Sequence, residues 1–290
     1  MESELFPGEV VHGGTLHRLA AFSDGLSGGN PAGVWLGEVL PSEAAMQALA
    51  TSVGYSETAF LAPLAGNGHT VRYFSPGGEV PFCGHASIAS GALLAARSGE
   101  DTYVLHTRVG PVPVQAQLNG GGAVASLTSV EPRQGPVEAA VLAEVLACLG
   151  WSLGDLDPAL PPLRAFAGAW HLVLAAHEPT LLHSLTYPFE RLRALMDTEG
   201  LLTLQLVHRT SPNVFIARNP APTCGVVEDP ATGSAAAALG GYLRSLGLVD
   251  PPCRITVLQG QAMGRPGRLE ISIPPSGGIA VAGTVVALKG

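Results

Sequence analysis

Basic residues are scarce in this sequence. Lys and Arg together number 15 among 290 residues, against 23 Asp and Glu, and the formal net charge is −8. The basic residues form no run anywhere along the chain. Because a surface that binds nucleic acid or an anionic membrane needs clustered cations, the sequence predicts neither kind of partner.

Cysteine is also rare, and the cysteines lie far apart, at Cys83, Cys148, Cys224 and Cys253. This spacing excludes a CxxC redox motif or a zinc ribbon, and it does not suggest a disulfide framework. Apolar runs stay well short of the roughly 18 residues that cross a membrane. The stretch 1–14 has three Glu and lacks the apolar core of a signal peptide. We therefore expect a soluble, cytoplasmic protein.

What the chain does contain is a large share of apolar and small residues. Hydrophobic residues make up 47% of it and charged residues 13%, so it can bury a large core. Its 37 Gly and 24 Pro indicate many tight turns between short elements. The length suits two domains of ordinary size, and the segment 131–136 resembles a boundary between them.

Hydrophobic periodicity predicts short strands separated by a few helices. A helix is expected after Ser42, its N-cap, and it should end at Gly54. The segment 137–149 reads as a helix, and 179–196 reads as a helix or a broken helix. Further helices, unusually rich in small residues, are expected over 86–96 and 235–246.

The last two helices belong to an internal echo. The segment that begins Gly84-His85 and the segment that begins Gly233-Ser234 each consist of a Gly, a polar residue and a helix of small residues. Each lies well inside its own half of the chain. The echo indicates duplication of a strand–loop–helix unit, although Ala-rich helices also resemble one another by composition alone.

Both echo segments offer a helix N-terminus to a ligand. The first N–H groups of a helix have no intrahelical acceptor and carry a partial positive charge, so they bind carboxylates and phosphates. A Gly at that place lets a ligand approach the backbone. Two such termini facing one cavity would suit a small anionic substrate, although ordinary capping is the more common explanation for any single helix start of this kind.

Several side chains that can transfer protons lie near these segments. Glu57 lies among the apolar residues of a predicted strand. If its side chain is buried it would suit proton transfer, and if it faces solvent it would be an ordinary surface residue of the strand. Asp229 precedes the second helix as a cap, a relay partner or an acid–base group. His85 has both catalytic and structural readings. Cys83 adjoins the first helix, but Pro230 or Ala231 stands at the matching place in the second half, which disfavours a two-thiol racemase.

Other catalytic signatures are missing from the sequence. HExxH, GxSxG, P-loop and GxGxxG patterns do not occur in a suitable context. Possible metal ligands are not clustered along the chain. The sequence therefore predicts neither a metal nor a nucleotide cofactor.

Five sequence motifs, named below in chain order, together resemble those of the PhzF-like family of phenazine-biosynthesis proteins over nearly the whole chain. No single motif decides the resemblance, which rests on their order and spacing. The motifs are Gly29–Val34, Ser56–Phe60, Cys83–Ala86, Glu228–Ala235 and Gln259-Gly260 with Met263–Gly267.

The resemblance implies a fold. It is the diaminopimelate epimerase fold, an α+β architecture of two pseudo-symmetric halves, each a β-barrel-like sheet around a central helix. The first domain would comprise residues 1–130, with the final strand 279–290 as a candidate to complete it, and the second residues 131–278. The Ala-rich helices would be the central helices, and the active site would lie in the cleft between the halves. A homodimer without cofactor is implied as well.

The resemblance also implies a reaction and its residues. The family enzyme of phenazine biosynthesis isomerises a dihydro-hydroxyanthranilate by moving a hydrogen. Our hypothesis is that Glu57 takes or delivers the proton, while His85 and Asp229 position the substrate and help relay the proton. The substrate would be a small cyclic or amino-acid-like carboxylate. The substrate-binding positions are Asn30, Gly84, Gly233 and Ser234.

Two alternatives stay open at this point. One is an amino-acid racemase or epimerase that works with Cys83 and an opposing carboxylate. The other is a non-catalytic small-molecule-binding protein that has kept the fold. The motifs do not decide the substrate, the direction of the reaction or whether phenazines are made.

Overall fold

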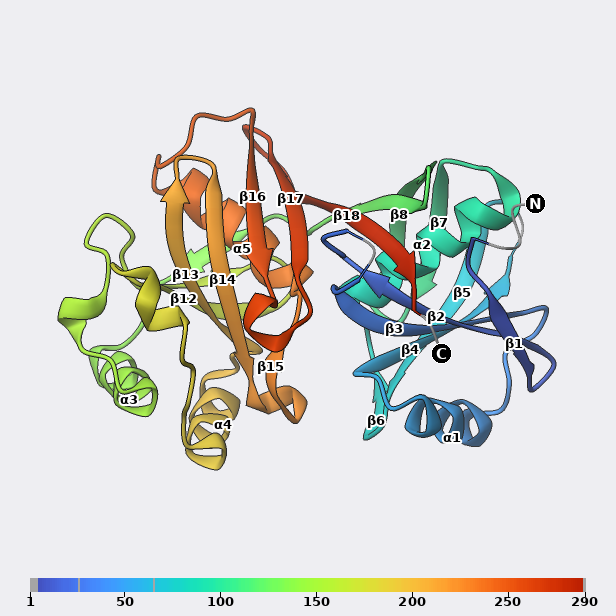
Figure 1. Cartoon of the computed structure of the whole chain (residues 1–290), viewed down its shortest axis with the longest axis horizontal. Coiled ribbons are helices and arrows are strands. Elements are labelled where there is room, and N and C mark those ends of the chain that lie inside the picture. Colours follow the sequence, from blue (N-terminus) through green and yellow to red (C-terminus); the bar gives the residue numbers. More distant parts are fainter. Residues whose placement is uncertain (1–4, 26, 65, 289–290) are drawn as a thin grey trace. The chain divides into compact units, whose positions relative to one another are not determined.

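The computed structural model describes residues 5–25, 27–64 and 66–288 (Figure 1). The ends of the predicted ranges 1–130 and 279–290, at residues 1–4 and 289–290, lie outside the described residues. The chain divides into two compact units. The first holds the residues up to Thr128 and those from Ala282 onward, and the second holds Ser129–Val281.

The first unit is a closed barrel. Its strands pair in the ring order β2, β3, β4, β5, β7, β8, β9 and β18, and β18 returns to β2. The β3–β4 and β5–β7 pairs are parallel, while β1 and β6 add to β2 and β5. The bounds are β1 (Gly8–Val11), β2 (Gly14–Ala21), β3 (Asn30–Gly37), α1 (Glu43–Val53), β4 (Glu57–Pro63), β5 (Gly68–Ser75), β6 (Gly78–Val80), α2 (Gly84–Ser98), β7 (Thr102–Thr107), β8 (Gly110–Asn119), β9 (Gly122–Thr128) and β18 (Ala280–Ala287).

Helix α2 runs through this barrel and contacts strands on several sides of it, among them β2, β3, β4 and β8. Every side chain from His85 to Ala96 is buried. An eight-stranded barrel normally encloses little more than its own side chains, so a helix inside it must carry small ones. At Gly91 even a Cβ atom would lie 2.4 Å from Val114 Cγ1. The small-residue composition of α2 is therefore a packing requirement.

The second unit wraps a sheet around α5. Its strands pair in the order β10, β11, β12, β13, β14, β16 and β17, with β12–β13 and β14–β16 parallel and β15 paired to β14. Helix α5 contacts β10, β11, β12, β13 and β17. The bounds are β10 (Arg133–Gly135), α3 (Ala139–Leu149), η2 (Leu153–Asp155), β11 (Leu163–Phe166), β12 (Trp170–Ala175), η3 (Pro179–Leu182), α4 (Phe189–Glu199), β13 (Thr203–Ser211), β14 (Val214–Ala221), η4 (Pro222–Cys224), β15 (Val226–Asp229), α5 (Gly233–Ser245), β16 (Cys253–Gln259), η5 (Gln261–Met263) and β17 (Gly267–Ile273).

The two units repeat one connectivity. From β2 in the first unit and from β11 in the second, successive pairs are antiparallel, parallel, antiparallel, parallel and antiparallel. A peripheral helix, α1 or α4, precedes the third strand, and the central helix, α2 or α5, precedes the next parallel strand. This repetition supports the duplication that the sequence echo indicates, and the two-domain α+β fold is confirmed.

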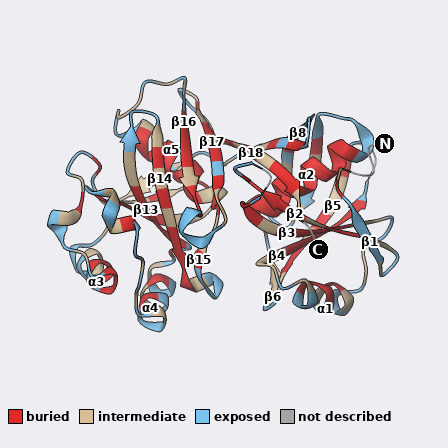
Figure 2. Ribbon diagram, in the orientation of Figure 1, coloured by how far each residue is buried: buried red, intermediate tan, exposed pale blue. Residues whose placement is uncertain are grey.

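Large apolar side chains also pack between the strands and the peripheral helices. In the first unit Met46 and Leu49 of α1 pack against Trp35, Phe60 and Phe74 of the barrel strands. In the second unit α3 and α4 cover strands β12 and β13 in the same way. Figure 2 shows buried residues along the strands and central helices and exposed ones on the outer faces of α1, α3 and α4. No helix in the described part of the chain is both long and apolar enough to cross a membrane.

The structure can be compared with the predicted ends of individual helices and with the predicted boundary segment. The Ser42 hydroxyl accepts from the Ala45 N–H at 3.3 Å, and Gly54 ends α1 in the left-handed region, as expected. The range 179–196 is a broken helix, η3 followed by α4, with Pro188 at the α4 N-cap. The second unit starts at Ser129, just before the expected boundary segment 131–136, and this segment contains strand β10, whose residues pair with β11.

A buried polar chain crosses the interior of the second unit. The Thr203 hydroxyl donates to Asn219 Oδ1 at 2.9 Å, so it accepts from the Nδ1–H of His171 at 2.7 Å. The His171 ring has no exposed surface. Burial disfavours its charged form and lowers the pKa of His171 from 6.5 to about 3.

We expect this histidine to make folding stability depend on pH. Below pH 6.5 the unfolded chain binds a proton at His171 that the folded chain excludes until the pH nears 3. Stability should therefore fall as pH drops through this window, by about 1.4 kcal/mol per pH unit from this residue. Urea unfolding at a series of pH values should give a shallower slope for His171→Asn than for wild type. The exposed His177→Asn variant should keep the wild-type slope, and equal slopes in all three would contradict the burial argument.

A second expectation concerns the tight contact at Gly91. Ala is a better helix former than Gly by about 1 kcal/mol, but its Cβ would clash with the buried Val114 side chain. Overpacking should win and destabilise Gly91→Ala by about 1–3 kcal/mol, measured as a lower thermal midpoint. Gly120→Ala, where a Cβ meets nothing within 4 Å, is the control. A Gly91→Ala protein with a higher melting temperature than wild type would show that the barrel interior has room for a methyl group at this position.

Candidate active site

In the first unit, three side chains with acid–base or nucleophilic chemistry meet at one end of the barrel. Glu57 is the first residue of β4, Cys83 is the N-cap of α2, and His85 lies in the first turn of that helix. Glu57 comes from a strand and lies 26 residues before Cys83 in sequence, whereas Cys83 and His85 both belong to the start of a helix. The barrel brings them together because the beginnings of β4 and α2 share the same end.

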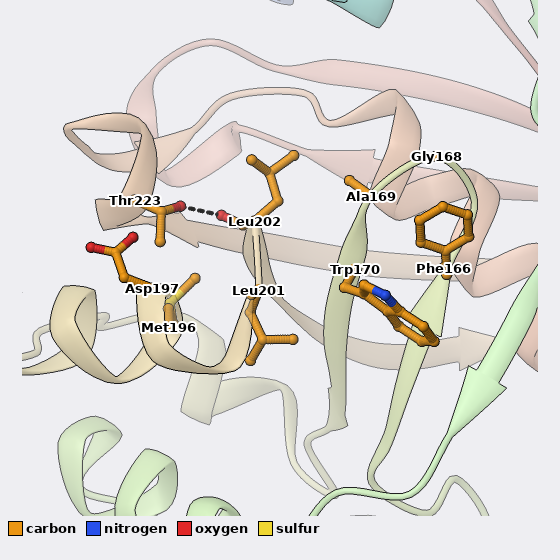
Figure 3. A pocket seen from close by; sticks show the side chains of 10 residues that line it. Phe166, Gly168, Ala169, Trp170, Met196, Asp197, Leu201, Leu202 and Thr223 are labelled. Carbon is orange, nitrogen blue, oxygen red and sulfur yellow. Dashed lines mark hydrogen bonds between the residues drawn. The ribbon is translucent and has the colours of Figure 1, made fainter. Parts of the chain in front are cut away.

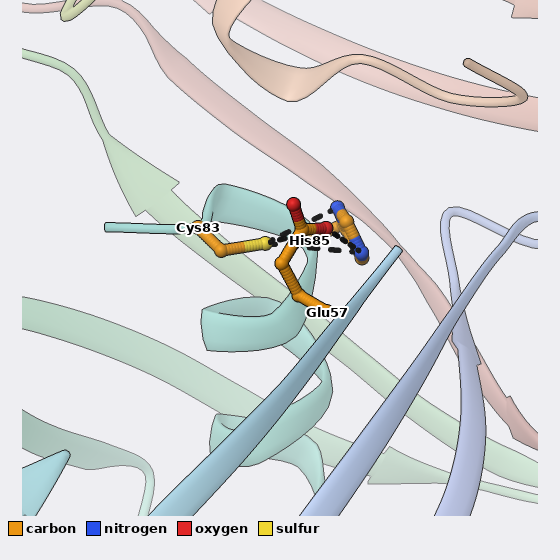
Figure 4. Close-up of side chains that lie close together, drawn as sticks. All are labelled: Glu57, Cys83 and His85. Atoms are coloured by element: carbon orange, nitrogen blue, oxygen red, sulfur yellow. Dashed lines mark hydrogen bonds and ion pairs between the residues drawn. The ribbon is translucent and has the colours of Figure 1, made fainter. Parts of the chain in front are cut away.

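The distances within this group are short (Figure 4). His85 Nε2 lies 3.4 Å from Glu57 Oε2, and Cys83 Sγ lies 3.6 Å from the same oxygen. Cys83 Sγ is also 3.4 Å from His85 Nδ1. The Ser56 hydroxyl, which the sequence did not single out, lies 3.4 Å from His85 Nε2. A carboxylate held by an imidazole and a thiol in this way can accept and return a proton.

Burial keeps the group ordered without closing it off. The side chains of His85 and Glu57 are 9% and 20% exposed, and Cys83 is buried. The carboxylate is thus the most accessible of the three. In such a partly dry setting, charge–charge and hydrogen-bond interactions are stronger than in water. Glu57 is therefore the member of the group best placed to meet a substrate.

Asn30 lies at the same end of the first barrel. It is the first residue of β3, its side chain is buried, and Ala32 two positions along pairs with Glu57 in the parallel β3–β4 register. The turn before it needs glycine at Gly29, where φ is +66° and a Cβ would lie 2.4 Å from the Ala21 carbonyl oxygen. The backbone of this motif therefore fixes where Asn30 starts the strand.

In the second unit, Asp229 is held at the N-terminus of α5. Asp229 ends β15 and Thr232 is the N-cap of the helix, and the Thr232 hydroxyl donates to Asp229 Oδ2 at 2.6 Å. The buried amide of Gln259 donates to the Asp229 carbonyl at 2.7 Å and to the Thr232 hydroxyl at 3.1 Å. The Thr232 N–H in turn donates to Gln259 Oε1 at 3.3 Å. Gly233 and Ser234 open the helix beside this clamp and are partly exposed.

The Gln259-Gly260 motif gains a physical reason here. Gly260 has φ +86°, and a Cβ there would lie 2.6 Å from the Pro230 carbonyl oxygen and 2.3 Å from that of Arg265. The η5 segment therefore packs directly against the loop that carries Asp229. Gly260 thus lets the η5 segment support this loop, and Gln259 helps to align the Asp229 carboxylate through its hydrogen bonds to Asp229 and Thr232.

Two sequence-based statements need correction. The second-unit residue that matches Cys83 is Thr232, the N-cap, and not Pro230 or Ala231, because α5 begins at Gly233 just as α2 begins at Gly84. Possible metal ligands are also clustered, since Glu57, Cys83 and His85 offer ligand atoms within 4.8 Å of one another. Linear spacing could not reveal this group because a strand and a helix supply it.

The repeated topology also shows how the units differ. Glu57 opens β4, and the corresponding strand of the second unit, β13, opens with Thr203. The parallel registers agree, since Ala32 pairs with Glu57 and His171 pairs with Thr203. The second unit thus has hydroxyls where the first has a carboxylate and a thiol. Its own carboxylate, Asp229, comes from β15 instead.

A separate pocket of about 390 Å³ lies on the second unit (Figure 3). It opens between the β11–β12 hairpin and the end of α4, and the Thr223 hydroxyl at its edge donates to the Leu202 carbonyl at 2.7 Å. No predicted site residue lines it. Its single ionisable lining residue, Asp197, gives it no acid–base pair. The lining residues are Phe166, Gly168, Ala169, Trp170, Met196, Asp197, Gly200, Leu201, Leu202 and Thr223.

Comparisons with known proteins agree on one family. Residues 19–290 match the family model described as PhzC-PhzF, phenazine biosynthesis-like protein. An uncharacterized isomerase of Deinococcus radiodurans is 34% identical over 89% of this chain and 86% of its own length. The trans-2,3-dihydro-3-hydroxyanthranilate isomerase of Pseudomonas aeruginosa is 30% identical over 88% of this chain and 89% of its own. The crystal structure of a PhzF-family protein from Bacillus anthracis superposes with a TM-score of 0.84 at 24% identity, covering 94% of this chain and 96% of its own.

We expect the Thr232 hydroxyl to be needed for the order of the Asp229 loop. Thr232→Val keeps the shape but removes the donor to the carboxylate and the acceptor for Gln259, and should lower stability by about 1–3 kcal/mol. Thr232→Ser keeps the hydroxyl and should lose less than about 1 kcal/mol. Thermal unfolding of both variants beside wild type measures the difference. Equal stability of Thr232→Val and wild type would mean that the clamp does not hold the loop.

Proposed function

Because the chain belongs to the PhzC-PhzF family of phenazine biosynthesis-like proteins, whose curated relatives are named isomerases, we propose a specific reaction for it. The protein moves a proton from one position to another on a small carboxylate, without a cofactor. The observation that carries this proposal is the accessible Glu57 carboxylate held by His85 and Cys83.

In the proposed reaction Glu57 acts as base and then as acid. Its Oε2 is held by His85 Nε2 at 3.4 Å and by the Cys83 thiol at 3.6 Å, which leaves Oε1 to face the substrate. The carboxylate takes a proton from a carbon atom beside an electron-withdrawing group and returns it elsewhere on the same molecule. His85 steadies the ionised carboxylate by donating a charge-assisted hydrogen bond to it.

The remaining predicted residues bind the substrate in this proposal. Helix N-termini favour anions, so Gly84 and the pair Gly233 and Ser234 suit the substrate carboxylate. Asp229, aligned by Thr232 and Gln259, positions the substrate and helps relay the proton. The family resemblance is what assigns both units to one reaction.

The name of one relative and the chemistry of the Glu57 group support a proposal for the substrate class. One relative, from Pseudomonas aeruginosa, is named for trans-2,3-dihydro-3-hydroxyanthranilate, a cyclic carboxylate with an acidic carbon-bound hydrogen. We propose a cyclic or amino-acid-like carboxylate of this kind as the substrate.

A second candidate reaction is a racemisation assisted by Cys83. Its support is the position of the thiol, 3.6 Å from Glu57 Oε2 and 3.4 Å from His85 Nδ1. Against it, the matching second-unit residue is Thr232, whose hydroxyl does not titrate in the range a racemase needs. The opposing group would then have to be Asp229.

The proposal is tested by solvent deuterium exchange followed by NMR. The panel holds dihydro-hydroxyanthranilate and several amino acids, and it compares wild type with Glu57→Gln and with Glu38→Gln, an exposed control. Wild type and the control should label the same compound, and Glu57→Gln should label it about 10²- to 10⁴-fold more slowly while keeping the wild-type melting temperature. Full exchange by Glu57→Gln would exclude Glu57 as the proton-transfer group. Inversion of a stereocentre that is lost in Cys83→Ser but kept in Glu57→Gln would favour the racemase.

A further inference from the structure

The Glu57–Cys83–His85 group has the composition of a transition-metal site. It combines a thiol, an imidazole and a carboxylate, the three side-chain types that bind Zn²⁺ in proteins. Thiolate and imidazole select Zn²⁺ over Mg²⁺ and Ca²⁺, which prefer oxygen ligands. Proton transfer by Glu57 requires the carboxylate and its histidine, but it does not explain why a buried thiol completes the triangle.

The distances fit tetrahedral coordination. With Zn–S near 2.3 Å and Zn–N and Zn–O near 2.0–2.1 Å, ligand atoms on a tetrahedron are about 3.3–3.6 Å apart. In the structure His85 Nε2 and Glu57 Oε2 are 3.4 Å apart, and Cys83 Sγ is 3.6 Å from that oxygen and 3.8 Å from that nitrogen. Shifts of a few tenths of an ångström would bring the three atoms around one ion.

Charge balance favours the same ion. A thiolate and a carboxylate carry two negative charges, which one Zn²⁺ neutralises, and His85 binds as the neutral ring. On binding, the thiol proton passes to solvent, and the Ser56 hydroxyl gives up its contact with His85 Nε2.

We propose that Glu57, Cys83 and His85 bind Zn²⁺ through three protein ligands, with the fourth position open to water or to a substrate carboxylate, and that the bound ion inhibits the enzyme. The ion takes the Glu57 oxygen and the imidazole that proton transfer requires. Metal binding stands on the geometry alone. The inhibition rests on the proposed function.

Binding is tested without any substrate. Zn²⁺ is titrated into the apo protein in competition with a chromophoric chelator, and Co²⁺ serves as a spectroscopic probe of thiolate ligation. Wild type should take up one equivalent and show a thiolate-to-cobalt charge-transfer band. Cys83→Ala should bind at least about tenfold more weakly, because it loses a first ligand, and it should lack the band. Cys224→Ala, a change at an exposed cysteine outside the group, should behave as wild type, and Mg²⁺ or Ca²⁺ should not compete.

The outcomes separate the two parts of the proposal. Equal Zn²⁺ affinity in wild type and Cys83→Ala, with both folded by circular dichroism, would overturn the site. If the site holds, one equivalent of Zn²⁺ should stop deuterium exchange by wild type and a chelator should restore it. Undiminished or faster exchange by the zinc-loaded enzyme would overturn the inhibition. A protein that exchanges no compound would contradict the proposed function while leaving the binding result in place.

Discussion

The fit of a helix inside a barrel is the constraint on which the rest of this structure depends. Every side chain of α2 from His85 to Ala96 is buried among strands, and at Gly91 not even a methyl group fits without displacing Val114. Close packing of this kind tolerates little movement. The helix N-terminus is therefore held in a fixed place at one end of the barrel, close to the side chain of Glu57, which begins β4.

The two units present the same arrangement with different side chains at the matching positions. The connectivity of the units is the same, yet the first unit starts β4 with Glu57 and caps α2 with Cys83, while the second uses Thr203 and Thr232 at these places. In the second unit the hydroxyls organise polar groups: Thr203 links His171 to Asn219, and Thr232 aligns Asp229. A shared fold thus separates a group that can move a proton from a group that holds a carboxylate in place.

Both of our proposals rest on the closeness of the Glu57, Cys83 and His85 side chains, which would suit Glu57 for proton transfer and would also let the group bind a metal ion. The proposed base, Glu57, is partly buried and held by an imidazole. Such an arrangement places it near other possible metal-ligand atoms in a setting of low dielectric constant. Adding Cys83 to Glu57 and His85 produces a set that borderline-soft cations bind. In our metal-binding proposal the Cys83 thiol is a ligand, whether or not it takes part in the reaction.

The sequence by itself determined the repeated small-residue helices, the α1 cap at Ser42, the order of the motifs and the candidates Glu57, His85 and Asp229, because capping and periodicity are local and motif order is linear. Only the tertiary structure decided that Cys83 joins Glu57 and His85, that Thr232 is its counterpart, and that 131–136 contains a paired strand. These depend on which strand ends share one end of a barrel and on where a helix begins in space. Strand pairing between residues far apart in the chain sets both, and no local pattern encodes it.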